Sequence, residues 1–251
     1  MKRQLRYLAT PFTMKKIMFD TKYGLEQAVL AGTKTMTRRA LPKLVQELLD
    51  AYTKGVCVVP EFTIPVGMSI EEFAEQFAKY PGKVIITHKD EQATFTPSEE
   101  EILEKILEHS TYKVGEVVAI AQRYSDMNRS TFPVFVSEKG VFMKTENSSG
   151  WNNKMYVQAD LMPHQIRITD VRIERIQDIS DEDCMREGVW KLESDGCPTM
   201  FTFDGWRFKN KVNRCTDSPK EVFEALFKKL SGKKAWNDNP WVFVYEFELV
   251  K

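Results

Sequence analysis

The sequence has few of the residues that build metal sites or disulfide frameworks. Its 251 residues include four cysteines and three histidines, and none of them is arranged as CxxC, HxxxH or HExxH. This spacing supports neither a zinc site nor a disulfide framework. No GxGxxG or GxxxxGK[ST] loop occurs either, which argues against dinucleotide and P-loop chemistry. We therefore expect no metal, no cofactor and the free thiols of a cytosolic protein.

Long apolar runs and an excess of one charge are also missing. There is no run of roughly 18 apolar residues, and the opening MKRQLRYLATPFTMKKIMF lacks the apolar stretch of a signal peptide. We expect a cytoplasmic protein without a membrane partner. Lys+Arg and Asp+Glu both number 36, so the formal net charge is zero. Proteins that coat long nucleic acid carry a clear basic excess, so any nucleic-acid contact here should be a pocket or a short patch.

The N-terminal segment has no acidic residue in its first 16 positions, although the chain as a whole is neutral. It carries five cations: Lys2, Arg3, Arg6, Lys15 and Lys16. A nucleic-acid-seeking arm and a loose tail are both consistent with this composition, and the tail is the simpler interpretation. Organised hydrophobic pattern begins only at Ile17. We therefore predict a flexible tail over residues 1–14 and regard Met14 as a candidate start.

A cluster of polar residues follows the first expected helix. This helix carries Leu25, Ala28 and Val29 on one face. Asp20 or Thr21 is its expected cap, and it ends at Gly32. The cluster lies in AGTKTMTRRAL, residues 31–41, and consists of Lys34, Thr35, Thr37, Arg38 and Arg39. Strand alternation would place Lys34, Met36 and Arg38 on one face and Thr35, Thr37 and Arg39 on the other. A turn would instead bring Lys34 and Thr37 together at i, i+3. The sequence leaves both arrangements open.

The remaining pattern predicts an α+β fold. Residues 42–110 hold three amphipathic helical segments (43–55, 69–82 and 98–110) and a hairpin at 83–96. Strands are expected at 17–19, 112–124, 164–179 and 241–250. The strand at 164–179 should contain a bulge near Thr169. In the strand at 241–250, apolar residues cover both faces near its start. Helices should follow Ser180, ending at Gly188, and Ser218, with Pro219 in the first turn. The segment 231–241 reads as a polar turn. Short, unevenly spaced strands with a few helices favour a small mixed barrel.

Four blocks, kept in order, carry a resemblance to a known family. They are LAGTKTMTRR, YKVGE, ITDVRIERIQDISDEDCMREGV and NPWVFVYEFEL. Together they resemble the ASCH domain family, whose members have a β-barrel related to the RNA-binding PUA domains. The resemblance implies a PUA-like β-barrel domain formed by residues 15–41 and 111–251, with flanking helices, interrupted by a mainly helical insertion at 42–110. Many relatives end one strand with an Arg-Glu pair; here that strand ends in Ala121-Gln122-Arg123-Tyr124, so a role of that pair does not carry over.

Some small bacterial members of the family look like amidohydrolases that remove an acetyl group from N4-acetylcytidine. The resemblance implies Lys34, Thr37 and Glu187 as the catalytic groups. A threonine hydroxyl needs a base to take its proton, and Lys34 can be that base only if burial lowers its pKa from about 10.4 toward 7–8. The simpler interpretations are a polar strand edge or phosphate contact for Lys34 and Thr37, and a surface carboxylate for Glu187.

The other polar residues near the cluster suit ligand binding. Arg38 and Arg39 suit phosphate or carboxylate, because a guanidinium does not release its proton; Thr35 and a stacking Tyr124 complete the expected binding set. Our leading hypothesis is recognition of RNA, or of a modified nucleoside or nucleotide, in a pocket between the end of the first helix and Glu187. The alternatives are hydrolysis of an acylated cytidine and a phage-derived or protein-interaction scaffold without chemistry.

Overall fold

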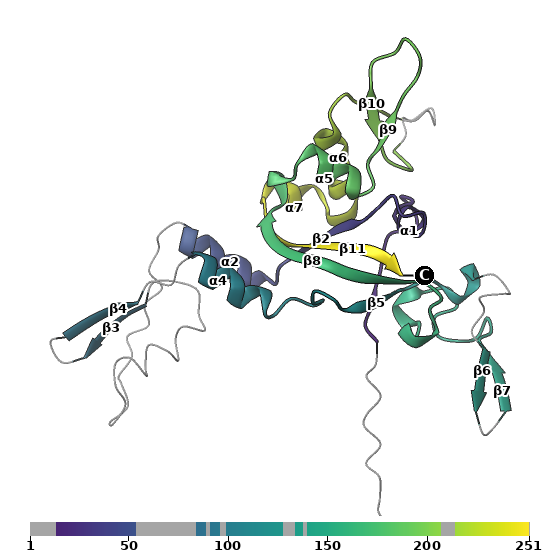
Figure 1. The fold of residues 1–251 in the computed structure, drawn as a ribbon, viewed down its shortest axis with the longest axis horizontal. Helices are drawn as coiled ribbons and strands as arrows, with labels where there is room; N and C mark the ends of the chain where they lie inside the picture. The colour runs from purple at the N-terminus through teal and green to yellow at the C-terminus, as the bar shows by residue number, and fades with distance from the viewer. Residues whose placement is uncertain are drawn as a thin grey trace, which may run out of the picture.

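The fold is a mixed α+β arrangement around one curved sheet (Figure 1). The computed structural model describes residues 14–53, 84–88, 91–95, 99–127, 134–137, 140–206 and 214–250. The strand order of the sheet is β1-β5-β8-β11-β2. Its strands are β1 (Lys16–Ile17), β5 (Val117–Ile120), β8 (Gln165–Arg175), β11 (Trp241–Val250) and β2 (Met36–Ala40). β1 pairs with β5 in parallel, and every other pair is antiparallel.

The two longest strands, β8 and β11, form the centre of the sheet. Residues Trp241 to Tyr245 are all buried, which confirms that this strand lies inside the sheet with apolar residues on both faces. The bulge predicted near Thr169 is also present. Glu246 pairs with Asp170, whereas the next residue, Phe247, pairs with Ile168, so Thr169 is the extra residue. The shift sets which side chains of β8 share a face with those of β11 and β2.

Helices cover one face of this sheet. α5 (Asp181–Arg186), α6 (Pro219–Ser231) and α7 (Lys233–Asn237) lie together above β2, β8 and β11 in Figure 1. The α6 stripe packs inward through Val222, Phe223, Leu226 and Phe227, while Leu230, which the periodicity assigns to the same stripe, is exposed. Ser180 and Ser218 cap α5 and α6 through bonds to Asp183 N and Glu221 N, as predicted.

The opposite face of the sheet carries aromatic side chains from β11. Phe247 packs against Phe19 with 5.6 Å between ring centroids, and Tyr245 packs against Tyr112 at 5.2 Å. Residues just beyond β1 thus approach β11, and the guanidinium of Arg39 in β2 donates to Met18 O at 2.6 Å. The two edges of the sheet are joined through this side chain. Among the described strands, the backbone ladders do not close into the barrel that the resemblance implies.

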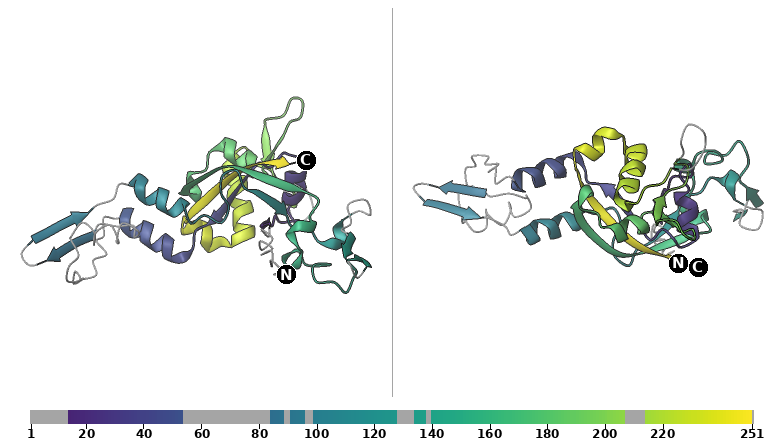
Figure 2. Two further views of the ribbon diagram at one scale, coloured as in Figure 1. Left: turned by 60° about the horizontal axis from the view of Figure 1, so that its bottom comes forward. Right: turned by 90° about the horizontal axis from the view of Figure 1, so that it is seen from above.

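The described parts of the segment 42–110 extend away from the sheet as an arm (Figures 1 and 2). It contains α2 (Lys43–Thr53), β3 (Val84–His88), β4 (Glu91–Phe95) and α4 (Glu99–Leu107). Two helices and the hairpin are therefore confirmed, and the helix expected at 69–82 lies outside the described residues, as does most of the tail 1–14. Gln46 anchors α2 because its amide donates to Trp241 O at 2.5 Å and accepts from Trp241 N at 2.7 Å.

Two local predictions were wrong. The helix α1 (Leu25–Leu30) is not capped by Asp20 or Thr21; Gly24, with φ +67°, is its N-cap residue, and Asp20 instead accepts from Tyr23 N in the preceding turn. The segment expected to be a turn into the last strand contains α7. Its Trp236 packs edge-on against Phe223 of α6, so burial stabilises a helix where the polar composition predicts a turn.

The other elements are short. They are the 3-10 turns Tyr124–Asp126, Lys154–Tyr156, Ala159–Leu161 and Ile176–Asp178, and the strands β6 (Val134–Ser137), β7 (Gly140–Met143), β9 (Trp190–Leu192) and β10 (Met200–Thr202). Among the described helices, none has the length and apolar character that crossing a membrane requires.

Candidate functional site

Lys34 lies between the end of α1 and the start of β2, and its ammonium is buried. Only 2% of the residue is exposed. Its Nζ donates to Met36 O at 2.7 Å, to Glu187 O at 2.7 Å and to Glu187 Oε2 at 2.6 Å. An ammonium has three N–H donors, so all three are used. Lys34 therefore joins the exit of α1 to the end of α5.

Glu187 is the C-cap residue of α5, where the helix leaves its last carbonyl groups without helical partners. The Lys34 cation bonds one of these carbonyls, that of Glu187 itself, and so compensates the negative end of the helix. Gly188, which follows with φ +108°, allows Leu25 of α1 to pack closely against the end of α5. A β-carbon there would lie 2.8 Å from Leu25 Cδ2. The sequence-distant pair Lys34 and Glu187 is thus brought into direct contact.

The pair belongs to a larger group of charges between α5 and the sheet, which we call the charge cluster. Its members are the cations Lys34, Arg38, Arg172 and Arg186 and the carboxylates Glu174, Asp183, Glu187 and Glu246. The ion pairs connect these eight side chains continuously, and Asp170 adds a contact to Arg172 at 3.6 Å. The cluster is balanced in charge, so it carries no excess that would draw in an anion by itself.

Arg38 is the most enclosed arginine of the cluster. Its guanidinium contacts Glu174 at 2.6 Å, Asp183 at 2.8 Å and Glu187 at 3.2 Å, and 1% of its side chain is exposed. Burial opposes its charge, but Glu187 and Glu174 outweigh that effect, so the pKa of Arg38 is raised. A guanidinium held by three carboxylates is not accessible to phosphate. Arg38 therefore orients Glu187 and does not fit the ligand-binding role predicted for it.

Thr37 lies on the other face of β2. Met36 begins the strand, so alternation places Met36 and Arg38 toward α5 and Thr37 toward the aromatic face, where it pairs with Tyr245. In the described part of the chain, no hydrogen bond joins the Thr37 hydroxyl to Lys34 or Glu187. The expected trio is therefore two contacting residues plus a third, Thr37, that is buried nearby on the opposite side of the strand.

Thr35 and Arg39 occupy different positions again. The Thr35 hydroxyl accepts from Arg186 Nε at 3.2 Å, so Thr35 lies at the margin of the charge cluster. Arg39 is exposed and lies with its guanidinium carbon 5.9 Å from the Phe19 ring centroid. Its charge is one of the causes that lower the pKa of Lys34. Arg39 is thus the accessible cation beside the Lys34–Glu187 pair.

Burial has the largest influence on Lys34. It lowers the pKa of the amine, while Glu187 acts in the opposite direction by attraction and by hydrogen bonding. The net shift is downward, which is the direction that a general base requires. The contact with Glu187 nevertheless places the proton of Lys34 between the amine and a carboxylate oxygen.

Tyr124 is part of the interior, which corrects the stacking role predicted for it. The residue has no exposed surface and packs in a small separate core with Ala119, Val157 and Met162. Its hydroxyl accepts from Gln158 N at 3.0 Å. A ring enclosed in this way has no face for a base.

The sequence reasoning missed most of the charge cluster. Arg172 and Glu174 stand two residues apart on β8, so both project from the same face of that strand, and this spacing was a usable signal. A second buried polar group was also missed: Glu26 of α1 accepts from Lys154 Nζ at 2.9 Å and from Gln122 Nε2 at 3.4 Å.

No family model, curated protein or solved structure matches this chain. Among the residues that the structure describes, no group of three or more His, Cys, Asp or Glu side chains is arranged to hold a metal ion.

Proposed function

We propose that the protein recognises a nucleobase through the Glu187 carboxylate, with the ligand a nucleoside or nucleotide, free or within RNA. The observation that supports this most directly is the way Glu187 is held. Lys34 bonds Oε2 at 2.6 Å and Arg38 bonds Oε1 at 3.2 Å, so the carboxylate has a defined orientation. Preorganised groups of this kind favour binding because little order remains to be imposed when the ligand arrives.

Although only 5% of Glu187 is exposed, its carboxylate retains hydrogen-bond capacity for a ligand. An ionised carboxylate offers about four lone-pair sites, and Lys34 and Arg38 occupy two of them. The remaining sites accept N–H donors, and the exocyclic amine of cytosine or the amine and ring N–H of guanine supply such donors. Uracil offers its ring N3–H but no exocyclic amine. The proposed site therefore favours amino-bearing bases over uridine.

This proposal includes the resemblance to the ASCH family, because that resemblance implies a ligand site between the end of the first helix and Glu187. We propose the PUA-like barrel on the same basis. The bond from Arg39 to Met18 O, which joins the two edge strands, supports it.

The test is a titration of the full chain with cytidine, guanosine and uridine by isothermal calorimetry. We expect cytidine or guanosine to bind and uridine to bind at least about tenfold more weakly. Glu187→Gln should weaken binding about 10- to 150-fold, which corresponds to a charge-assisted bond of about 1.5–3 kcal/mol. Glu248→Gln, a change of the same kind at an exposed residue of β11, is the matched control. Equal affinity of the Glu187→Gln variant, or a wild type that binds none of the three, contradicts the proposal.

A second candidate, hydrolysis of N4-acetylcytidine, is favoured by one observation: burial lowers the pKa of Lys34. In this reaction neutral Lys34 takes a proton from water, the hydroxide attacks the acetyl carbonyl, and the C–N bond breaks as Lys34 returns the proton to the leaving amine, which gives cytidine and acetate. With Thr37 as the nucleophile, an acetyl-threonine ester forms first and water then hydrolyses it to acetate. Release of acetate by the wild type and its loss in Lys34→Ala would support this candidate, and loss in Thr37→Ala would assign the nucleophile. A wild type that binds nucleosides but releases no acetate supports binding without hydrolysis. A wild type that neither binds nucleosides nor releases acetate supports the scaffold alternative.

A further inference from the structure

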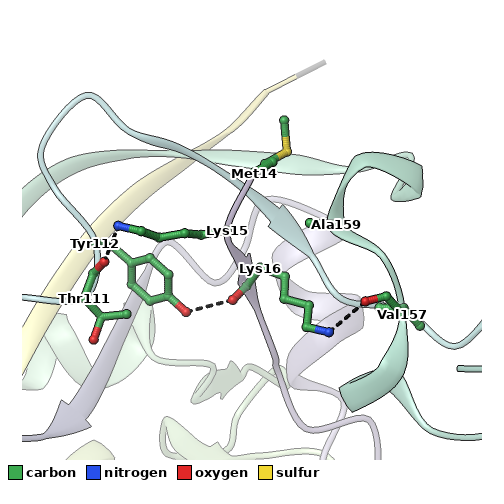
Figure 3. A pocket seen from close by; sticks show the side chains of 7 residues that line it. All are labelled: Met14, Lys15, Lys16, Thr111, Tyr112, Val157 and Ala159. Carbon is green, nitrogen blue, oxygen red and sulfur yellow. Dashed lines mark hydrogen bonds between the residues drawn. The ribbon is translucent and has the colours of Figure 1, made fainter. Parts of the chain in front are cut away.

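A hollow of about 390 Å³ lies beside β1, away from the charge cluster (Figure 3). It is lined by Met14, Lys15, Lys16, Thr111, Tyr112, Val157 and Ala159. Its volume falls within the range of small-ligand sites, about 300–1,000 Å³. Two cations, a phenol ring and three apolar side chains thus share one concave surface outside the nucleobase site, and Val157 also belongs to the small core around Tyr124.

The two lysines hold their ammonium groups apart. Lys15 Nζ donates to Thr111 O at 2.7 Å and contacts Glu116 at 3.0 Å, whereas Lys16 Nζ donates to Val157 O at 2.7 Å and to Met155 O at 2.5 Å. Figure 3 shows the side chains extending toward opposite sides of the hollow. Each ammonium has three donors, so each retains a donor beyond these two partners. Separated cations of this kind suit an extended polyanion better than one compact anion.

Arg39 continues this line of cations toward Glu187. Within the described residues, its hydrogen bond is the one to Met18 O, which leaves four of its five N–H donors for other partners. Met18 follows Lys16 by two residues, and the hydroxyl of Tyr112, a residue that lines the hollow, donates to Lys16 O at 2.9 Å. The pKa of Tyr112 is raised by burial, and the charge of Arg39 opposes that rise. Arg39 therefore acts electrostatically both on Tyr112 of the hollow and on Lys34.

The surroundings of the hollow also suit unstacked bases. Met155, whose carbonyl binds Lys16, is 58% exposed, and the next residue, Tyr156, is 63% exposed. An exposed aromatic ring beside spaced cations is the combination that single-stranded nucleic acid uses, because bases stack on the ring and phosphates contact the cations.

We propose that Lys15, Lys16 and Arg39 bind the phosphodiester backbone of a single strand whose base enters at Glu187, so that the ligand is an oligonucleotide and not a free nucleoside. This rests on the proposed function for the base. The backbone contacts are independent of the base contact, and the two can be removed separately.

The test compares an eight-nucleotide, fluorescein-labelled RNA that contains cytidine with free cytidine, using anisotropy for the strand and calorimetry for the nucleoside. We expect the strand to bind at least about tenfold more tightly. The double variant Lys15→Gln, Lys16→Gln should lose most of this advantage and keep its cytidine affinity, and the triple variant that adds Arg39→Gln should lose the whole advantage. For single strands each phosphate contact contributes about −0.7 to the slope of log K against log salt, so the slope should shrink by about 2.

A matched control changes three exposed lysines of α6 and α7 to glutamine, namely Lys229, Lys233 and Lys234, and should keep both the affinity and the slope. If the triple variant does not fold, Arg39→Gln alone should reduce the slope by about 0.7.

DNA of the same sequence that binds equally also supports the proposal, since the phosphodiester is shared. Strand affinity no greater than cytidine affinity, an unchanged slope, or equal binding of hexaglutamate overturns it. A wild type that binds neither strand nor cytidine rejects this proposal and the proposed function together, whereas cytidine binding without a strand advantage rejects this one alone.

Discussion

Replacing Lys34 with methionine removes the buried ammonium and keeps an unbranched side chain of similar length. The substitution leaves Glu187 Oε2 without its 2.6 Å partner, and leaves the carbonyls of Met36 and Glu187 without the donor they share. Arg38 remains 3.2 Å from Oε1, so the carboxylate is not left entirely without a cation. The perturbation therefore tests how strongly this pair holds α5 against β2.

The expected cost follows from the burial of both partners. Removing one member of a buried ion pair costs about 3–5 kcal/mol, because the other charge stays buried without compensation. In a chain of this size each kcal/mol lowers the melting temperature by about 2–4 °C, so we expect a decrease of about 6–20 °C. The double variant Lys34→Met, Glu187→Leu should be less destabilised than the sum of the two single variants, by at least about 2 kcal/mol, since no charge is then stranded.

Urea unfolding followed by circular dichroism measures these free energies, with Lys43→Met as the control. Lys43 forms an exposed pair with Glu47 at 3.6 Å on α2, and such pairs contribute about 0–1 kcal/mol. If Lys34→Met lowers the free energy of unfolding no more than Lys43→Met does, the charge cluster does not hold α5 in place and our reasoning about its role is wrong.

Two further predictions concern residues away from the pair. Burial raises the pKa of Cys184 from about 9 to about 12, so between these values the folded protein keeps a proton that the unfolded chain loses. The contribution of Cys184 to the free energy of unfolding should therefore be fully present below pH 9 and decrease between pH 9 and pH 12. Cys184→Ala should flatten that decline in urea unfolding at pH 8, 9.5 and 10.5, and an equal decline would contradict the assignment. Tyr124→Phe removes the acceptor for Gln158 N and should cost about 1 kcal/mol in the same assay while leaving cytidine affinity unchanged; a loss of cytidine affinity would return Tyr124 to the binding site.

Local pattern was sufficient for most helices and strands. The caps at Ser180 and Ser218, the Pro219 start and the bulge at Thr169 follow from side-chain chemistry or from hydrophobic periodicity within a few residues, and the structure contains all of them. The exceptions depended on contacts across the fold. The α7 helix forms because Trp236 packs on α6, and nothing in the polar sequence around it signals that contact.

The composition of the site was only partly predictable. The resemblance paired Lys34 with Glu187, and the structure brings these two residues together. The side on which Thr37 lies depends on where β2 begins, since moving the start of a strand by one residue reverses the faces of every side chain in it. Tyr124 was misjudged because its burial depends on segments more than 20 residues away, among them Gln158 and Met162.

The sequence by itself determined most of the elements, the neutral charge balance and the polar segment after α1, because these depend on residues close together in the chain. Only the tertiary structure decided that Lys34, Arg38 and Glu187 meet, together with Arg172, Arg186 and Glu246. Ion pairs between strands and helices depend on register and on the bulge, and one residue of shift exchanges every partner. The tertiary structure also decided that Arg39, unlike its neighbour Arg38, is exposed, since neighbouring residues of a strand face opposite sides.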